Sequence, residues 1–561
     1  MKFDSITIKN FRNFDNITIK LDNKNVFFGM NDVGKTNFLY ALRYLFDREI
    51  RKRNLIDTDF YKKHTNKPIE ITVSIDISDI NDPDSEKLRA KVKGALRSGQ
   101  NTVFIQLKAQ YDSKDMSANI ELSWGGDVTQ LEPIRAKGYT FDIDSVFNVI
   151  YIDAYVNLYG LFKKNTAILL KNDEDQDRDT LNEINEGIKT LNNKISSLSG
   201  IKNFEKEVTP IYGNFRGDDV EVTIKSELAV NGLYSNVVPY IKVAGSEELY
   251  PTSGEGRKKL LVYAIYNILA REKDETKINL FLIEEPENHL HRAIQIALSH
   301  EIFVGKKYKY TFMTTHSSYI LAEMDKVNLV RIFNDTKVDS ASSFYTVPEG
   351  FEKLKKQLNK GLVEAIFADK VLLVEGPSEE VLFEKVLDEK EPKYPIMGVY
   401  ILAVNGIDFS PYVKLLKELQ IPYVVKTDND LRKSGNKDKY KPIGFSRINA
   451  MIGEELLPED PVDEDGIESR RNLYDLNKEK LDDIRKNHHI YLSRVSLEED
   501  LDEVLHANMV QYLPEADGDI IAYLKGHKKY NMIKLVEKLT NEDCDKIFHH
   551  YNFACLEEIL K

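Results

Sequence analysis

One short stretch constrains this 561-residue chain more than any other. Residues 29–36 read GMNDVGKT and match the phosphate-loop pattern G-x4-G-K-[ST], with a strand-like run before them and a helical pattern after them. This order predicts an α/β domain in which backbone N–H groups and a helix N-terminus hold phosphate oxygens. Lys35 would reach the β- and γ-phosphates, and Thr36 would hold Mg²⁺. A glycine turn with a chance lysine is the alternative interpretation.

An acidic pair follows a strongly apolar run further along the chain. Residues 280–283 (LFLI) predict a buried strand, and Glu284 and Glu285 come directly after it. A phosphate-loop ATPase needs a carboxylate at such a strand end, so Glu284 suits the magnesium shell and Glu285 suits the polarisation of the attacking water. The alternative is a strand that simply ends in exposed acids.

Between these motifs, apolar residues recur at alternating spacings of three and four. The pattern predicts a helix with one apolar stripe, made of Leu181, Ile184, Ile188, Leu191, Ile195 and Leu198. The helix either packs on its own domain or is an inserted dimerisation element. An acidic stretch at 173–179 before it reads as a solvated loop.

Three further acidic motifs each follow a strand-like run in the C-terminal third of the chain. They are E-G-x2-E, D-x-D and E-x-D, and their acids are Glu375, Glu379, Asp428, Asp430, Glu498 and Asp500. Acids at the carboxyl ends of parallel strands converge at one sheet edge, where they can hold two Mg²⁺ or Mn²⁺ ions for phosphodiester cleavage. Any one pair alone could instead belong to a solvated loop.

A nuclease of this kind also needs a cation near the scissile phosphate. Lys528 follows the third acidic motif and suits that role, although Lys525 and Lys529 are close neighbours. The alternative is a lysine on a solvated helix.

The ATPase motifs resemble those of the ABC-type ATPases of the SMC and RecF group. Residues 8–14 resemble the opening strand of that group, and residues 252–257 resemble the signature loop that closes over a partner subunit's γ-phosphate. Residues 314–317 (TTHS) resemble its switch-histidine segment. Taken with the phosphate loop, the resemblance implies these nucleotide-binding residues: Gly29, Asn31, Gly34, Lys35, Thr36, Asn37, Ser253, Glu284, Glu285 and His316.

The order of the C-terminal acids resembles a Toprim domain, and an ABC-type ATPase fused to a Toprim domain resembles the OLD (overcoming lysogenisation defect) nucleases. Within that family, the chain resembles the nuclease subunits of Gabija anti-phage systems. The resemblance implies a DNA endonuclease that cuts or nicks phage DNA with Mg²⁺ or Mn²⁺ and is regulated by ATP with Mg²⁺. It also implies a homodimer or homotetramer and a UvrD-like helicase partner. The lack of a signal-peptide pattern and of a membrane-spanning run leads us to expect a cytoplasmic protein. Many relatives carry Asp where this chain has Glu284, so ATP could act more as a sensed ligand than as a fuel.

We therefore expect an α/β protein with four segments. An ABC-type P-loop ATPase domain would comprise residues 1–150 and 243–345, with a helical dimerisation insertion at 151–242 and a C-terminal Toprim domain at 346–561. Residues 431–441 and the acidic 458–465 read as surface loops.

Composition limits the kind of DNA binding to expect. Lys and Arg total 78 and Asp and Glu total 91, for a net charge of −13, which disfavours non-specific nucleic-acid binding through overall charge. DNA binding should therefore be local and metal-dependent, with basic runs remaining at 51–53, 306–307 and 525–529. The two cysteines exclude a disulfide scaffold, and neither a signal peptide nor a membrane-spanning run is present.

Two other functions fit parts of the same pattern. The chain could be a RecF- or SMC-like repair ATPase that clamps DNA without cutting it, or a nucleotide-switched scaffold that recruits a helicase. The first predicts clamping without cleavage, and the second predicts partner binding that survives the loss of every acid named above.

Overall fold

The protein is described here from a computed structural model. The described residues are 1–29, 33–137, 140–155, 157–158, 160–161, 164–165, 178–203, 205–206, 240–242, 249–251, 255–271, 276–334, 337–406, 408–435 and 439–561. They form two units. One comprises Met1–Tyr151, Thr276–Glu287 and His291–Lys561, and the other comprises Ile152–Glu275 and Asn288–Leu290.

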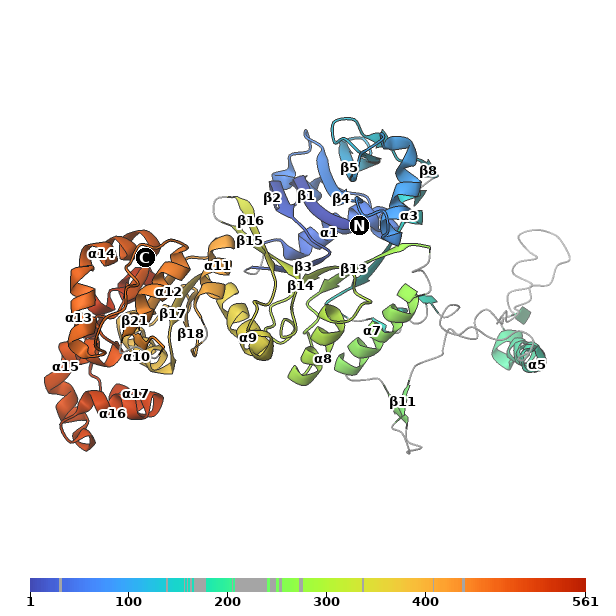
Figure 1. Ribbon diagram of the computed structural model, residues 1–561. Helices are drawn as coiled ribbons and strands as arrows, with labels where there is room; N and C mark the ends of the chain where they lie inside the picture. The colour runs from blue at the N-terminus through green and yellow to red at the C-terminus, as the bar shows by residue number, and fades with distance from the viewer. Residues whose placement is uncertain are drawn as a thin grey trace. The chain divides into compact units, whose positions relative to one another are not determined.

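An antiparallel sheet opens the chain (blue in Figure 1). Its order is β2 (Phe14–Lys20), β1 (Lys2–Phe11), β4 (Ile69–Asp76), β5 (Thr102–Asp112), β6 (Ser117–Gly125) and β7 (Glu132–Pro133). Apolar and polar residues alternate along β4, so that one face is buried and the other is partly solvated. Helix α3 (Pro83–Val92) lies between β4 and β5 in sequence.

The second sheet holds the strands that end at the phosphate-binding motifs. Its order is β10 (Phe147–Ile152), β13 (Ile278–Glu284), β14 (Tyr310–Thr314), β3 (Lys24–Phe28), β15 (Val327–Asn334) and β16 (Val338–Tyr345). Strands β13, β14, β3 and β15 are parallel, and β16 returns antiparallel to β15. β13 is buried along nearly its whole length, as its uninterrupted apolar sequence predicts.

Helix α1 (Lys35–Phe46) leaves the phosphate loop and joins both sheets in one hydrophobic core. Phe38, Leu39 and Leu42 are fully buried there, because they repeat at helical spacing on one face of α1. The same core includes side chains of β1, β4, β13 and β14. Helices α8 (Arg292–Phe303) and α9 (Lys355–Ile366) follow β13 and β16 in sequence.

The C-terminal domain has a four-stranded parallel sheet with helices around it (Figure 1). Its order is β18 (Val399–Ala403), β17 (Lys370–Val374), β19 (Tyr423–Thr427) and β22 (Ile490–Leu492). Because all four strands run the same way, the segments after β17, β19 and β22 leave from one edge. That edge is where the three acidic motifs of the sequence begin.

Helices surround this sheet, and those on one side share a hydrophobic core with it. The helices are α10 (Pro377–Lys390), α11 (Ser410–Glu418), α12 (Ile443–Ile452), α13 (Ile467–Leu476), α14 (Lys478–His488), α15 (Leu497–Tyr512), α16 (Ile520–Gly526), α17 (Lys528–Val536), α18 (Asn541–Phe548) and α19 (Cys555–Leu560). Cys544 and Cys555 are free and buried in that core.

The expected surface loop at 431–441 is not a simple loop. It contains a short antiparallel hairpin of β20 (Leu431–Lys433) and β21 (Tyr440–Pro442), in which Leu431 pairs with Pro442. The sequence interpretation missed it because only three residues of each strand pair, too few for a visible alternating pattern.

The second unit contains the helix expected from the heptad stripe. Helix α5 runs over Arg178–Ser196, and helix α7 over Glu255–Arg271. Whether α5 dimerises stays a prediction. In the part of the chain that is described, no helix combines the length and apolarity needed to cross a bilayer.

Candidate nucleotide and nuclease sites

The phosphate loop begins and ends on glycines that no other residue could replace without strain. Gly29 and Gly34 have φ of +145° and +105°, where L side chains are disfavoured. A Cβ at Gly29 would collide with the carbonyl oxygen of Ile332, and one at Gly34 with the side chain of Asn13. Asn31 lies outside the described residues.

The side chains after the loop converge on the end of β13. Lys35 Nζ donates to the carbonyl oxygen of Gly29 at 2.9 Å, so the lysine curls back over the loop. Thr36 Oγ1 donates to Glu284 Oε1 at 2.5 Å, and Tyr151 Oη donates to Glu284 Oε2 at 2.5 Å. Thr36 and Glu284 are therefore already adjacent, as residues that share one magnesium shell must be.

Asn37 supports the loop from behind. Its side-chain Nδ2 donates to Asn13 Oδ1, and its side-chain Oδ1 accepts from Arg12, both at 2.9 Å. Asn13 in turn donates to the carbonyl oxygen of Val33 at 2.7 Å. Both polar atoms of the Asn37 side chain are therefore already hydrogen-bonded within the protein.

The switch-histidine segment lies beside the same site. Burial and the nearby charge of Lys35 lower the pKa of His316, while Glu285 acts in the opposite direction. His316 is therefore a neutral imidazole near both groups at neutral pH. Ser253 of the expected signature loop lies outside the described residues.

A third acid of this motif, Glu287, was missed by the sequence interpretation. Its carboxylate accepts from Thr315 Oγ1 at 2.8 Å and from the backbone N–H of His316 at 2.7 Å, and burial raises its pKa. Glu287 therefore fixes the backbone that carries His316. Its place three residues after Glu284 was the available signal.

In the C-terminal domain, the segments after β17 and β19 meet through Glu375. Glu375 Oε1 accepts from Thr427 Oγ1 at 2.5 Å and from the backbone N–H of Asp428 at 2.7 Å. These bonds fix the strand-end acid against the next strand, so the first two acidic motifs lie side by side as expected.

Glu379 and Asp428 are both buried at this edge. Burial, and then the charges of Glu375 and Glu498, raise the pKa of Glu379 to about 7. Burial also raises the pKa of Asp428 well above its ordinary value, helped by Glu375, Glu379 and Asp430. A divalent cation would stabilise these carboxylates, because they repel one another and are largely buried from water.

The third acidic motif contributes Glu498, and α17 contributes Lys528. Ser496 Oγ lies 2.7 Å from Oε2 of the buried Glu498 and also contacts Glu499, so its single proton is shared between these two carboxylates. Burial alone would lower the pKa of Lys528, but the charges of Glu498, Asp428 and others raise it. Lys525 instead donates to Glu499 at 2.5 Å, so Lys528 is the lysine that faces the acids.

Asp500 does not join this group, contrary to our expectation. Its Oδ2 accepts from Lys426 Nζ at 2.9 Å in a pair whose side chains are each 1% exposed, and its Oδ1 accepts from the backbone N–H of Arg494 at 3.1 Å. Glu498 and Asp500 lie on helix α15, where residues two apart point in different directions. The expectation failed because it treated the E-x-D motif like the extended D-x-D motif.

Two arginines that the sequence interpretation did not name also reach the acidic edge. Arg447 on α12 bonds to Glu375 at 2.5 Å and pairs with Asp430 at 3.1 Å, and Arg470 lies 3.8 Å from Asp430. Among the described residues, no three acids, histidines or cysteines are already gathered tightly enough to hold one ion. Arg447 accounts for part of this spacing, since its guanidinium lies between two of the acids.

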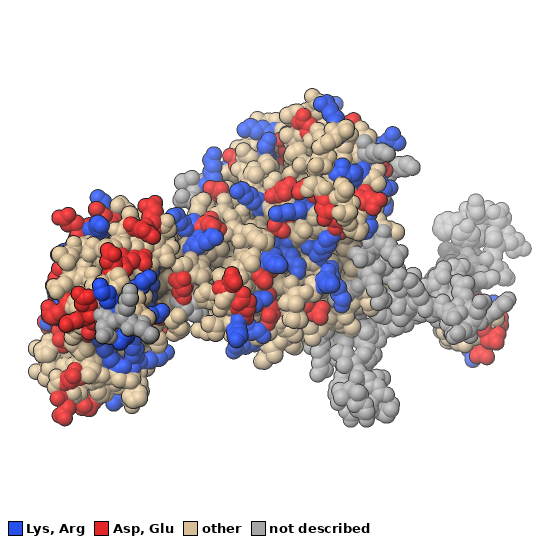
Figure 2. Space-filling view, viewed as in Figure 1, with Lys and Arg blue, Asp and Glu red and all other residues tan. Residues whose placement is uncertain are grey.

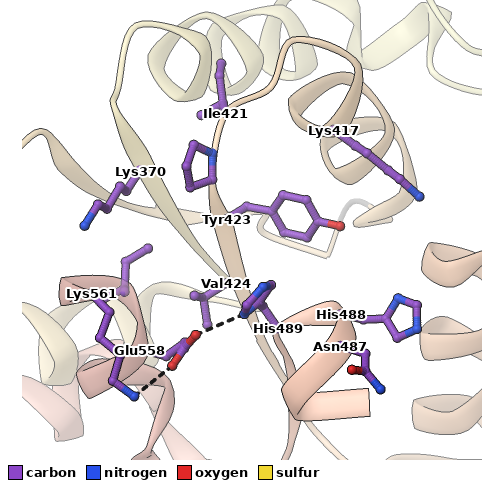
Figure 3. Close-up of a pocket in the computed structure, with 12 residues that line it drawn as sticks. Lys370, Lys417, Ile421, Tyr423, Val424, Asn487, His488, His489, Glu558 and Lys561 are labelled. Carbon is purple, nitrogen blue, oxygen red and sulfur yellow. Dashed lines mark hydrogen bonds and ion pairs between the residues drawn. The ribbon is translucent and has the colours of Figure 1, made fainter. Parts of the chain in front are cut away.

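A pocket of about 500 Å³ lies at the opposite end of the same sheet (Figure 3). Lys370, Lys417 and His489 are among the residues that line it, and α11, α14 and α19 all end there. Cations at helix C-termini are expected because they complement the helix dipoles, and Lys370 donates to the carbonyl oxygen of Leu560 at 3.3 Å. The pocket therefore has a structural explanation and is not our candidate active site.

Comparison with known proteins agrees with this architecture. Residues 1–124 and 145–321 match the AAA ATPase domain family, and residues 366–430 match the family described as overcoming lysogenization defect protein-like, TOPRIM domain. Endonuclease GajA of Bacillus cereus (strain VD045) is 43% identical over 575 aligned residues, covering 100% of this chain and 99% of the relative. The OLD nuclease of Thermus scotoductus (strain ATCC 700910 / SA-01) is 22% identical and covers 81% of this chain and 89% of its own.

Solved structures give weaker likenesses. The C-terminal region of the Burkholderia pseudomallei OLD protein covers 35% of this chain and 98% of its own, at 19% identity and a TM-score of 0.22. An SMC head bound to the C-winged helix domain of ScpA covers 64% of this chain and 100% of its own, at 14% identity and a TM-score of 0.37. Both scores are too low to support a conclusion.

The two matched domains and the full-length relative define a Toprim-type nuclease of the OLD class with an ATP-binding domain. The fold expectation of an ATPase domain followed by a Toprim domain is thereby confirmed. By its identity over the full chain, the protein belongs to the family of the endonuclease GajA.

Proposed function

We propose that this protein is a metal-dependent DNA endonuclease, regulated by nucleotide binding, that acts in bacterial defence against phage. The observation that carries the proposal is one sheet edge at which five carboxylates and one lysine influence one another electrostatically. They are Glu375, Glu379, Asp428, Asp430, Glu498 and Lys528.

The donor set fits a hard divalent cation. All five acids offer carboxylate oxygens, the ligands that Mg²⁺ and Mn²⁺ prefer. Burial and the neighbouring carboxylates raise the pKa of Glu379 and of Asp428, so a bound cation would stabilise their ionised forms. The five acids would hold Mg²⁺ or Mn²⁺. When bound, such ions activate water and stabilise the leaving oxygen.

The protein's own side chains then have separable roles. Ser496 contacts Glu498, and the backbone N–H of Asp428 orients Glu375 before substrate arrives. Lys528 lies among the acids and would neutralise the charge that develops on the scissile phosphate. Asp500 forms a buried ion pair with Lys426, and in this proposal it does not contact the reacting atoms.

The N-terminal site would bind ATP with Mg²⁺. The phosphate loop, including Asn31, would hold the phosphates together with Lys35, and Thr36 and Glu284 would hold the ion. Glu285 would face the attacking water, and His316 would respond to the γ-phosphate. The hydrogen bond between Thr36 and Glu284 supports this assignment. Ser253 would contribute from a second subunit.

The wider assembly is also part of the proposal. The family resemblance supports a homodimer or homotetramer that works in the cytoplasm with a UvrD-like helicase on phage DNA. Helix α5, with apolar residues at heptad spacing, supports the insertion as the dimerising part.

One experiment tests cutting and its regulation together. Supercoiled plasmid is incubated with purified protein and Mn²⁺ over a series of ATP concentrations. We expect nicked or linear product whose rate depends on ATP, and we expect Lys35→Ala to remove the ATP dependence while cutting continues. Absence of cutting under every nucleotide condition would refute the nuclease proposal, and an ATP dependence that survives in Lys35→Ala would refute the nucleotide site.

A further inference from the structure

The β20–β21 hairpin is tied at both ends to a residue of the carboxylate edge. Asp430 directly precedes β20, and its carbonyl oxygen accepts from the backbone N–H of Ile443 at 2.8 Å and of Gly444 at 3.2 Å, where α12 begins. The hairpin therefore leaves from and returns to the acidic site. Its position relative to that edge is fixed by backbone hydrogen bonds.

The hairpin register places two cations opposite each other. Leu431 pairs with Pro442, and Arg432 pairs with Lys441. Because successive residues of a strand point to opposite faces, the buried pair Leu431–Pro442 faces inward and the exposed pair Arg432–Lys441 faces outward. Like charges directly opposite one another destabilise a hairpin. The fold tolerates this cost in the segment that directly follows Asp430 at the carboxylate edge.

Among the described residues, acids near this outer face form no ion pair with Arg432 or Lys441. Asp463 instead pairs with Lys439, the residue before β21, at 3.7 Å. Hydrogen bonds from Asn449 at 3.0 Å and Ser446 at 2.7 Å, and then the charge of Lys441, lower the pKa of Glu459, but Glu459 and Lys441 form no ion pair within the described residues.

Within the described residues, the Arg432 side chain makes no hydrogen bond or ion pair. Figure 2 shows Lys and Arg side chains gathered on the part of the C-terminal domain where Figure 1 labels β21. An exposed basic face next to a phosphodiester-cutting edge fits a polyanion better than any other partner.

We propose that the outer face of the β20–β21 hairpin, carrying Arg432 and Lys441, binds the phosphate backbone of duplex DNA and guides it to the carboxylate edge. This inference rests on the proposed nuclease function. It also reconciles a chain of net charge −13 with DNA binding, because the attraction is confined to one surface element.

The test is a double neutralisation, Arg432→Gln with Lys441→Gln, in the full chain. Binding to a fluorescently labelled duplex is measured by anisotropy in EDTA, so that no cutting occurs, over a series of salt concentrations. We expect affinity to fall by about tenfold to a hundredfold, and the slope of log affinity against log salt to shrink by about two, since each cation neutralises about one phosphate. Thermal stability should stay equal or rise, because the like-charge pair is gone.

The matched control is Lys20→Gln with Lys114→Gln, which removes the same charge from exposed positions of the ATPase domain. We expect this control to bind DNA as the unchanged protein does. If the hairpin variant keeps the original affinity and salt slope, or if both variants weaken binding equally, the hairpin assignment is overturned. The proposed nuclease function is judged separately, on the unchanged protein. It stands if that protein cuts plasmid with Mn²⁺, whatever the hairpin variant does, and it fails if that protein neither binds nor cuts DNA.

Discussion

The ring centroids of His316 and Phe367 lie 6.0 Å apart, and their planes meet at an angle of 35°. Phe367 also meets Phe28 edge-on at 5.7 Å, and Phe28 directly precedes the first glycine of the phosphate loop. Phe367 ends helix α9, three residues before β17, the strand that ends at Glu375. A side chain of the segment that leads into the nuclease sheet therefore contacts the nucleotide site.

This contact predicts that Phe367→Ala uncouples the two sites. Coupling between two binding sites commonly changes an affinity by about 5-fold to 150-fold. We expect the ratio of cutting rates with and without ATP to move close to one, while cutting with Mn²⁺ alone is retained. Phe344→Ala, at an exposed position of β16, is the control and should keep the ratio. A full ATP response in Phe367→Ala would show that this contact does not transmit the signal.

The raised pKa of Glu379 predicts how stability depends on pH. A carboxyl group whose pKa is about 7 in the fold and 4.5 in the unfolded chain binds more protons when folded, so its contribution is present below pH 4.5 and is lost as pH rises through 7. We expect the metal-free protein to lose up to about 3 kcal/mol between pH 5 and 8 from this group.

Thermal unfolding from pH 5 to 8, in EDTA and in Mn²⁺, measures this effect. Glu379→Gln should make the profile in EDTA less steep, because a neutral amide does not titrate, although Asp428 still contributes. Added Mn²⁺ should restore stability at pH 8 in the unchanged protein only. A metal-free profile that rises from pH 5 to 8 and is unaffected by Glu379→Gln would contradict the burial of this acid.

Asp500 and Glu498 should respond in opposite ways to the loss of their carboxylates. Asp500→Ala leaves Lys426 buried without its partner, which typically costs about 3–5 kcal/mol. Glu498→Ala removes a charge from a repulsive cluster and should cost far less stability, yet abolish cutting. Urea unfolding and Mn²⁺-dependent cutting, measured on both variants, separate these roles. If Asp500→Ala is stable but inactive, Asp500 is a metal ligand and not a structural partner of Lys426.

Arg447 should compete with the metal. Its guanidinium bonds to Glu375 and Asp430, so an ion that uses these acids must displace it. Arg447→Gln should bind Mn²⁺ several-fold more tightly, by about 1 kcal/mol, because no charge-assisted hydrogen bond has to be broken first. Calorimetric titration of Mn²⁺ measures the affinity directly. Weaker binding in the variant would show that Arg447 supports the ligands instead of competing for them.

Local pattern was enough to predict the parts of each site that lie at strand ends. The acids Glu375 and Asp428 meet as expected, because the carboxyl ends of neighbouring parallel strands lie at one edge of the sheet. Asp500 could not be placed, since the face of a helix on which a residue lies depends on where that helix begins. Arg447 reaches Glu375 from α12 by tertiary packing alone, and nothing in its sequence neighbourhood marks it.

The central claim is that the carboxylate edge of the C-terminal sheet is the cutting site. The most direct test is the Mn²⁺-dependent conversion of supercoiled plasmid by the unchanged protein and by Glu379→Gln, with Glu479→Gln at an exposed position of α14 as the control. We predict that the unchanged protein and the control cut at similar rates and that Glu379→Gln, although folded, cuts at least about a hundredfold more slowly. Equal cutting by all three proteins would contradict the account.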